Sequence, residues 1–166
     1  YRNLMNLTME ERSQINYDHP NSMDFDLMKD QLTNLINGNP ISVPEYDYKT
    51  HTRTQSSRNI ENPTIIIIEG ILALYDSDIR NLMNLKIYID VADDIRIIRR
   101  IRRDVNKRKR SLSSIVKQYY NTVRPMHNQF VETTKKYADI IIPEGCHNKV
   151  AIEILRTKIM SLIITK

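Results

Sequence analysis

The chain has 166 residues with 40% apolar and 27% charged side chains, which is typical of a single soluble globular domain. Its one cysteine, Cys146, excludes an intrachain disulfide framework, and no apolar run approaches the ~20 residues of a membrane-spanning helix. The net charge of +5 is concentrated in residues 99–110, which hold eight basic residues and one acidic residue and leave −2 for the rest of the chain.

The first half of the chain predicts a helix, a hairpin and a buried strand. Apolar residues recur at helical spacing over Met23–Ile36, and Gly38 and Pro40 supply the stop. The polar segment Ile41–Ile60 is rich in Thr and Tyr and has no helical period, so it predicts a hairpin. Four consecutive isoleucines in Thr64–Glu69 predict a strand buried on both faces, as in parallel sheets.

The second half predicts two further strands between helices. Asp76–Asn84 predicts a short helix, and Leu85–Asp90 and Ala138–Ile142 predict the strands. Asn148 is expected to cap the last helix. Three core strands alternating with helices indicate an α/β fold with a parallel sheet flanked by helices.

The basic run is predicted to form a helix followed by a loop. Asp93 or Asp94 is expected to cap this helix, and Lys107–Arg110 to form the loop. Ser111 then caps a long helix that Pro125 kinks or breaks. The basic helix has an apolar stripe, expected to face the core, that consists of Ile95, Ile98, Ile101 and Val105.

A basic run of this density fits two kinds of partner. It can bind nucleic acid through phosphate contacts. Its arginines can also clamp a small polyphosphate, because a guanidinium pairs with two phosphate oxygens at once. Composition alone does not choose between them.

Two carboxylates, Glu69 and Asp18, lie at positions where they could bind a metal ion or a sugar. Glu69 follows the isoleucine strand, at the carboxyl end where ligands bind to open parallel sheets, and could orient Mg²⁺ or its water shell. Its simpler interpretation is a strand-terminal residue in solvent. Asp18 precedes His19-Pro20, where it could accept hydrogen bonds from sugar hydroxyls or merely bond its own backbone in a turn.

The hairpin gathers aromatic and polar side chains that could recognise a flat base. Tyr46, Tyr48, His51 and Arg53 all lie within eight residues. Their alternative role is cross-strand pairing on an edge hairpin. The four histidines have no metal-ligand spacing among themselves or with Cys146, so we expect no zinc site.

Five motifs in this order resemble the uridine/cytidine kinases, a family of P-loop nucleoside kinases, and the match runs along essentially the whole chain. The motifs are Asn16-Tyr-Asp-His-Pro20, Tyr46-Asp-Tyr-x-x-His-Thr-Arg53, Ile68-Glu-Gly-Ile71, Arg99-Arg-Ile-x-Arg-Asp104 and Lys135-Lys-Tyr-Ala-Asp139. The resemblance implies a single, truncated kinase-like domain over residues 1–166, with a nucleoside-site hairpin at 41–60 and a lid at 104–111. It also implies transfer of the γ-phosphate of ATP, or GTP, to the 5′-hydroxyl of uridine or cytidine in pyrimidine salvage, with Mg²⁺, by a homotetramer. The single cysteine fits a reducing compartment and no signal segment opens the chain, so we expect a cytoplasmic protein.

The resemblance further implies a role for each matching residue. The residues that would contact the nucleoside are Tyr1, Asp18, Tyr46, Tyr48, His51, Arg100 and Gln118. Of these, Asp18, Arg100 and Gln118 would hold the ribose, Tyr46 and His51 would read the pyrimidine edge, and Tyr48 would stack on the base. Arg103, Arg108 and Arg110 would form the catalytic lid over the ATP phosphates, and Glu69 would contact the metal.

The chain departs from the family pattern in two places. Relatives commonly have Arg-Gly-Arg where this chain has Lys109 between two arginines, and Gly tolerates backbone angles that Lys adopts poorly. No Gly-x-x-x-x-Gly-Lys-Ser/Thr loop is present, since the three glycines are Gly38, Gly70 and Gly145. In the family this loop, its central strand and the catalytic Asp precede the tyrosine that matches Tyr1.

These departures lead to two expectations. The 166 residues alone should not phosphorylate a nucleoside. They should also be unstable or aggregate, unless the sheet is completed by a missing segment or another chain, because two-sided isoleucine strands would be exposed. A non-catalytic nucleoside-binding or assembly subunit is the alternative function, a phosphoribulokinase-like enzyme is an alternative within the fold, and a nucleic-acid-binding protein is the least favoured.

Overall fold

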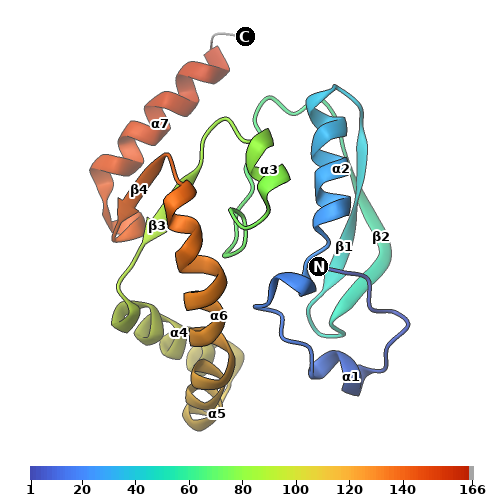
Figure 1. Cartoon of the computed structure of the whole chain (residues 1–166), viewed down its shortest axis with the longest axis vertical. Helices are drawn as coiled ribbons and strands as arrows, with labels where there is room; N and C mark the ends of the chain where they lie inside the picture. Colours follow the sequence, from blue (N-terminus) through green and yellow to red (C-terminus); the bar gives the residue numbers. More distant parts are fainter. Residues whose placement is uncertain (165–166) are drawn as a thin grey trace. The chain divides into compact units, whose positions relative to one another are not determined.

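The computed structural model describes residues 1–164, with the side chains of Cys146 and Ile164 left out (Figure 1). The expectation that Cys146 joins no zinc site therefore lies outside the described residues. The chain forms two compact units, Tyr1–Asn84 and a second that begins at Leu85. Within the described residues, no helix is long and apolar enough to cross a membrane. The α/β class is confirmed, with an antiparallel hairpin in the first unit and a parallel strand pair in the second.

The first unit is built from an antiparallel hairpin and short helices. Its elements are α1 (Met9–Ser13), a 3₁₀ turn (Pro20–Ser22), α2 (Phe25–Ile36), β1 (Ile41–Asp47), β2 (Thr52–Ile60) and α3 (Ser77–Leu82). The predicted helices and hairpin of this half are confirmed, with Asp24 capping α2 and Asp76 capping α3 through side-chain oxygens. The most completely buried apolar residue in its core is Ile79, which is 1% exposed.

The predicted strand Thr64–Glu69 is wrong. The segment lies between β2 and α3 without strand pairing to any described residue, and Ile67 is 75% exposed. An apolar run becomes a strand only when a neighbouring strand supplies hydrogen-bond partners for its backbone. Of the three predicted core strands, the described residues therefore form two.

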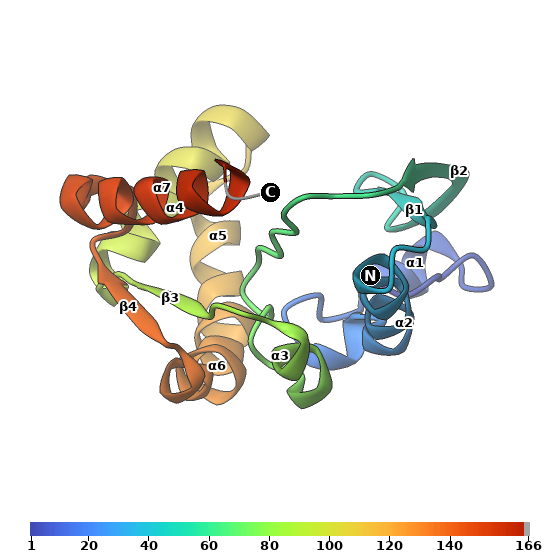
Figure 2. The same ribbon diagram turned by 90° about the horizontal axis from the view of Figure 1, so that it is seen from above.

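The second unit contains the parallel pair and most of the helical residues. Its elements are β3 (Ile87–Asp90), α4 (Asp93–Arg108), α5 (Leu112–Gln118), α6 (Arg124–Met126), β4 (Ile140–Pro143) and α7 (Lys149–Ile164), with π-helical turns at Tyr119–Val123 and His127–Val131 and 3₁₀ turns at Glu132–Tyr137 and Gly145–His147. β3 and β4 pair in parallel from Ile87 opposite Ile140 to Asp90 opposite Pro143, which confirms both predicted strands (Figures 1 and 2). Asn148 caps α7, since its side-chain oxygen accepts from the Ala151 amide at 3.1 Å.

Pro125 neither breaks the long helix nor leaves it regular. Ser111 caps α5 as predicted, accepting from the Ser114 amide at 3.3 Å. The chain then keeps right-handed helical angles through Val131, with one π-helical turn before Pro125 and one after it. Wider turns absorb the missing proline amide and the bulk of its ring, so the helix continues.

Two expectations for α4 are wrong. Its N-cap is Ala92, without a side-chain cap, and Asp93 is ion-paired with Arg96 instead. The apolar stripe does not face a core, because Ile95, Ile98 and Val105 are all exposed and the buried residue of α4 is Asp104. The part of α4 that is buried therefore carries the ion-paired Asp104 and not the isoleucine stripe.

The boundary between helix and lid also differs from the prediction. Helix α4 continues through Arg108, so only the last two residues of the predicted loop, Lys109 and Arg110, follow the helix. Lys109 takes the left-handed conformation at the C-cap, with φ 55° and ψ 33°. This is a backbone angle that favours glycine, which agrees with the residue expected there from the resemblance.

Candidate functional site

Five rings of the first unit form one aromatic cluster, which consists of Tyr1, Tyr17, Tyr46, Tyr48 and His51. Tyr1 lies at the centre, with ring centroids 4.9 Å from Tyr46, 5.6 Å from Tyr17 and 6.4 Å from Tyr48. Tyr17 stacks on His51 at 5.1 Å with 17° between the ring planes. Tyr48 is 74% exposed, which leaves aromatic surface open to a flat ligand.

The hairpin places three of these rings through irregular backbone. The β1–β2 register shifts between Pro44 and Tyr46, and such a bulge re-aims the side chains that follow it. His51 ends the four-residue turn with φ 54°, a left-handed conformation that histidine tolerates better than most residues. This angle turns its ring toward Tyr17 rather than along the strand.

Polar contacts fasten the N-terminal segment to the hairpin. The Arg12 guanidinium donates to the backbone oxygens of Leu4 at 2.9 Å, Met5 at 3.3 Å and Thr50 at 3.0 Å. The buried Thr52 hydroxyl accepts from the Leu4 amide at 3.0 Å. These bonds hold residues distant in sequence at the turn where the rings meet.

An ion pair supports the centre of the cluster. Arg53 donates through Nε to the Tyr1 carbonyl at 2.9 Å and through Nη2 to the Asp24 carboxylate at 2.7 Å. Burial alone would raise the pKa of Asp24, but the bonds from Arg53 and from the Leu27 amide hold that pKa below its usual value. Arg53 therefore joins the start of α2 to the base of the aromatic cluster.

The cluster disfavours ionisation of its phenols. Burial raises the pKa of Tyr46, with further contributions from Tyr17 and Tyr1, and its buried hydroxyl makes no hydrogen bond of normal geometry within the described residues. Burial also raises the pKa of Tyr1, followed by the influence of Tyr48 and of Asp18. The negative charge of Asp18 contributes to this rise in the Tyr1 pKa, and its role at the ribose stays a prediction.

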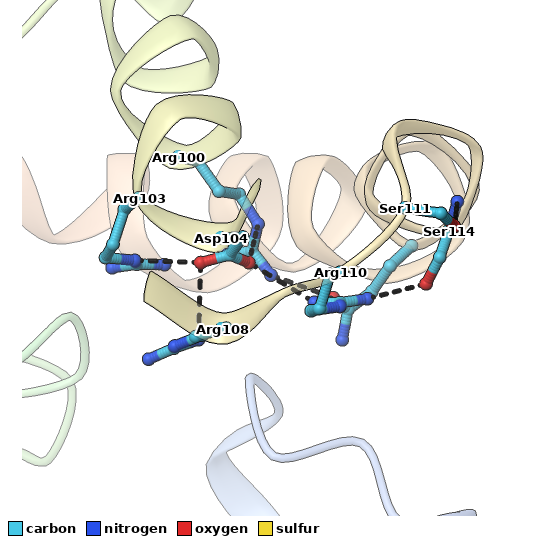
Figure 3. Close-up of polar contacts among 8 residues, drawn as sticks. Arg100, Arg103, Asp104, Arg108, Arg110, Ser111 and Ser114 are labelled. Atoms are coloured by element: carbon cyan, nitrogen blue, oxygen red, sulfur yellow. Dashed lines mark hydrogen bonds and ion pairs between the residues drawn. The ribbon is translucent and has the colours of Figure 1, made fainter. Parts of the chain in front are cut away.

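Four arginines of the second unit converge on one buried carboxylate, and we call this group the arginine cluster: Arg100, Arg103, Arg108 and Arg110 with Asp104 (Figure 3). The distances from guanidinium nitrogen to carboxylate oxygen are 2.9 Å for Arg103, 3.2 Å for Arg110, 3.5 Å for Arg108 and 3.9 Å for Arg100. The Asp104 side chain is 0% exposed.

Helix α5 closes the other side of the arginine cluster. Gln118 accepts through Oε1 from Arg100 at 2.9 Å and from Arg110 at 2.7 Å, and Arg110 also donates to the Ser114 hydroxyl at 3.0 Å. Gln118 thus joins an arginine predicted to hold the ribose with one predicted to lie over the phosphates. The cluster as a whole presents excess positive charge, which suits a phosphate ligand.

Glu69 belongs to neither the aromatic cluster nor the arginine cluster. It is exposed at the end of the unpaired isoleucine segment. Among the described residues, no group of three or more His, Cys, Asp or Glu side chains is placed to hold a metal ion. Mg²⁺ in phosphate chemistry is commonly held by one or two carboxylates plus the phosphates themselves, so Glu69 stays a prediction.

Sequence reasoning identified most of these side chains but missed two central ones. The structure brings Tyr1, Tyr46, Tyr48 and His51 together in the first unit, and the four arginines and Gln118 together in the second. Tyr17 was overlooked, although it directly precedes Asp18 in a motif that had been singled out. Asp104 ends the motif Arg99–Asp104 and begins the predicted lid, but it was given no role of its own.

Comparison with known proteins gives a consistent result. The family model described as Phosphoribulokinase / Uridine kinase family matches residues 2–151. The uridine kinase of Lactobacillus helveticus is 51% identical over 163 residues, which cover 98% of this chain and 77% of the relative. Those of Macrococcus caseolyticus and Staphylococcus carnosus are each 53% identical over 98% of this chain, covering 79% and 78% of the relatives.

Proposed function

The chain belongs to the phosphoribulokinase / uridine kinase family, and we propose that it serves the phosphorylation of uridine or cytidine by ATP. One observation carries the proposal: half or more of the residues are identical to those of proteins named uridine kinase along 98% of the chain. Identity at this level over nearly the whole length makes the chain a phosphotransferase by kinship, with a nucleoside as acceptor.

The two groups of side chains suit the two halves of this chemistry. The aromatic cluster offers an exposed Tyr48 ring for stacking and the polar edges of Tyr46 and His51 for the pyrimidine, and Asp18 supplies a carboxylate for ribose hydroxyls. The arginine cluster would neutralise the ATP phosphates. Phosphoryl transfer depends mainly on positioning and charge neutralisation, with Mg²⁺ bound to the phosphates and Glu69 as its proposed protein contact.

We further propose that these 166 residues by themselves bind the nucleoside without phosphorylating it. The sequence contains no Gly-x-x-x-x-Gly-Lys-Ser/Thr, the loop whose amides cradle ATP phosphates. The second candidate function is a non-catalytic nucleoside-binding or assembly subunit, which would bind the nucleoside without converting it. A binding assay and a turnover assay on the same polypeptide separate the two proposals.

The binding assay is titration calorimetry with uridine, cytidine and adenosine. Uridine or cytidine should bind and adenosine should not, because the hairpin is proposed to read the edge of a single pyrimidine ring. His51→Ala should weaken binding roughly tenfold, equivalent to ~1.4 kcal/mol for a lost ring contact and hydrogen bond. The exposed His147 in the second unit provides the control, and His147→Ala should leave the affinity unchanged. Equal affinity for adenosine would contradict the proposed pyrimidine site.

The turnover assay measures UMP formation from uridine and radiolabelled ATP with Mg²⁺. Uridine binding without UMP formation supports a nucleoside-binding polypeptide that lacks the ATP loop. Formation of UMP by these 166 residues alone would contradict the proposed inactivity while supporting the kinase function. Failure to bind either pyrimidine nucleoside would overturn the proposed function itself.

A further inference from the structure

We propose that Asp104 is the positioning residue of the arginine cluster, an internal anion that keeps Arg103 and Arg108 aligned for a polyphosphate and does not touch that ligand. The inference rests on the proposed function, because the ligand it assumes is the polyphosphate of the phosphoryl donor. It assigns a role to the one residue of α4 that is fully buried.

The geometry excludes Asp104 from direct contact with a ligand. Its side chain is 0% exposed, and both carboxylate oxygens face guanidinium groups: Oδ1 lies near Arg103 and Arg108, and Oδ2 near Arg110 and Arg100 (Figure 3). Its backbone oxygen also accepts from the Lys109 amide and, at 3.1 Å, from the Arg110 amide. Asp104 therefore organises the turn after α4 through its main chain and the arginines through its side chain.

The arginines around Asp104 divide into two kinds. Arg110 uses Nη1 on Asp104 and Gln118 and Nη2 on Ser114, so both of its terminal nitrogens are engaged by protein acceptors. Arg103 holds Asp104 through Nε and is 48% exposed, while Arg108 makes the looser 3.5 Å contact and is 56% exposed. Arg103 and Arg108 are thus anchored at one point and open to solvent beyond it, as a phosphate-binding arginine requires.

Charge explains why one carboxylate is placed among four cations. Without it, four guanidinium groups would repel one another and move apart into solvent. With it, the cluster retains a net charge of +3, which still attracts a polyanion. Arginines that are already ordered lose less side-chain entropy when the ligand binds, and this is the benefit of preorganisation.

A different role for the same carboxylate makes the opposite prediction. If Asp104 merely competed with phosphate for the arginines, Asp104→Asn would strengthen binding by removing the competitor. If Asp104 positions them, the same isosteric change should weaken binding, because the arginines lose their common anchor. The sign of the change in affinity therefore separates the two roles.

The test is calorimetric titration of the 166-residue chain with inorganic tripolyphosphate at fixed salt. Asp104→Asn should raise the dissociation constant about tenfold, and Asp104→Glu, which keeps the charge, should restore most of the affinity. The control is Asp93→Asn on the same helix, an exposed residue paired with Arg96, which changes the net charge equally and should shift the affinity less than twofold. Circular dichroism verifies the fold of each variant. Unchanged or tighter binding by folded Asp104→Asn would overturn the proposal.

A second measurement on the unmodified chain keeps the proposal testable if Asp104→Asn does not fold. The Arg103 Nε–H bonded to Asp104 should exchange with solvent at least tenfold more slowly than that of Arg102, an exposed neighbour for which the described residues offer no ion pair. Equal exchange at the two arginines, measured by NMR without ligand, would overturn the positioning role. Absence of tripolyphosphate binding to the unmodified chain would overturn the phosphate role, while uridine titration of the same sample reports separately on the proposed function.

Discussion

Asp24 carries two separable structural roles, and replacing it by Asn and by Ala should reveal the size of each. Its Oδ1 accepts from the Leu27 amide at 3.3 Å and caps α2, while its Oδ2 pairs with Arg53 at 2.7 Å. Asn is as good an N-cap as Asp, so Asp24→Asn can keep the cap through its one oxygen, but its amide nitrogen cannot accept from Arg53 and the pair is lost. Asp24→Ala removes both the cap and the pair.

The structure sets the expected magnitudes. The pair is largely shielded, with side-chain exposure of 15% for Arg53 and 25% for Asp24, so solvent screens it only in part. A hydrogen bond to a charged group contributes ~1.5–3 kcal/mol, so Asp24→Asn, which loses this bond, should lower the free energy of unfolding by about 2 kcal/mol. Asp24→Ala should lower it by about 3 kcal/mol, because loss of the cap adds ~1 kcal/mol to the loss of the pair.

The pH dependence of the free energy of unfolding gives a second test of the Asp24–Arg53 pair. The pKa of Asp24 is lower in the folded state than in the unfolded chain, so its contribution is complete above the unfolded value of ~3.9 and is lost as the pH falls through the folded pKa. The stability gap between the unmodified chain and Asp24→Asn should therefore be widest at neutral pH and narrow below about pH 4.

Urea unfolding at pH 7 and pH 3 measures both effects. The chain has nine tyrosines and no tryptophan, so tyrosine emission reports on the aromatic cluster that Arg53 supports. If Asp24→Asn cost as much as Asp24→Ala, the cap would contribute nothing beyond the pair. A gap that stays constant down to pH 3 would refute the assignment of the loss to an ionised carboxylate.

Three further changes test the fold in other places. Lys109→Gly should raise the free energy of unfolding by about 0.5–1 kcal/mol in thermal or urea melts, because it relieves a left-handed backbone that costs a non-glycine residue ~1–2 kcal/mol; a loss of stability would contradict the C-cap geometry. Ile67→Ser should reduce self-association in light scattering with less than ~0.5 kcal/mol lost, since Ile67 is exposed; a large loss would show that this residue is buried in the folded polypeptide. Tyr88→Phe should cost ~1–2 kcal/mol, because the Tyr88 hydroxyl donates to the Glu132 carboxylate at 2.8 Å, and an unchanged melt would mean that water replaces this bond fully.

Local signals in the sequence predicted local structure well. The caps Ser111 and Asn148 act within three residues of their own positions, so the pattern that identifies them is also what forms them. The hairpin over residues 41–60 likewise follows from composition and a short turn, and its four-residue turn brings His51 to stack on Tyr17.

Failures arose where the outcome depends on a partner distant in sequence. The run Thr64–Glu69 has the composition of a strand, but pairing is decided by another segment, and none of the described residues supplies one. The apolar stripe of α4 has a helical period, but periodicity states which side chains share a face and not what covers that face. Ile98 is accordingly exposed, while Asp104, an aspartate in a basic run, is buried.

The aromatic cluster and the arginine cluster are each organised by charged residues. In the first unit Arg53 bonds to Tyr1 while pairing with Asp24, and in the second Asp104 pairs with four arginines, so in each case one buried or partly buried carboxylate orders the group. Apolar packing tolerates changes of shape with modest loss, whereas a half-satisfied charge network is worse than none. The geometry of both groups should therefore respond more strongly to isosteric loss of charge than to truncation of nearby isoleucines, which are already exposed in α4. In both groups the residue that orders the predicted binding side chains is an aspartate, Asp24 in the first unit and Asp104 in the second.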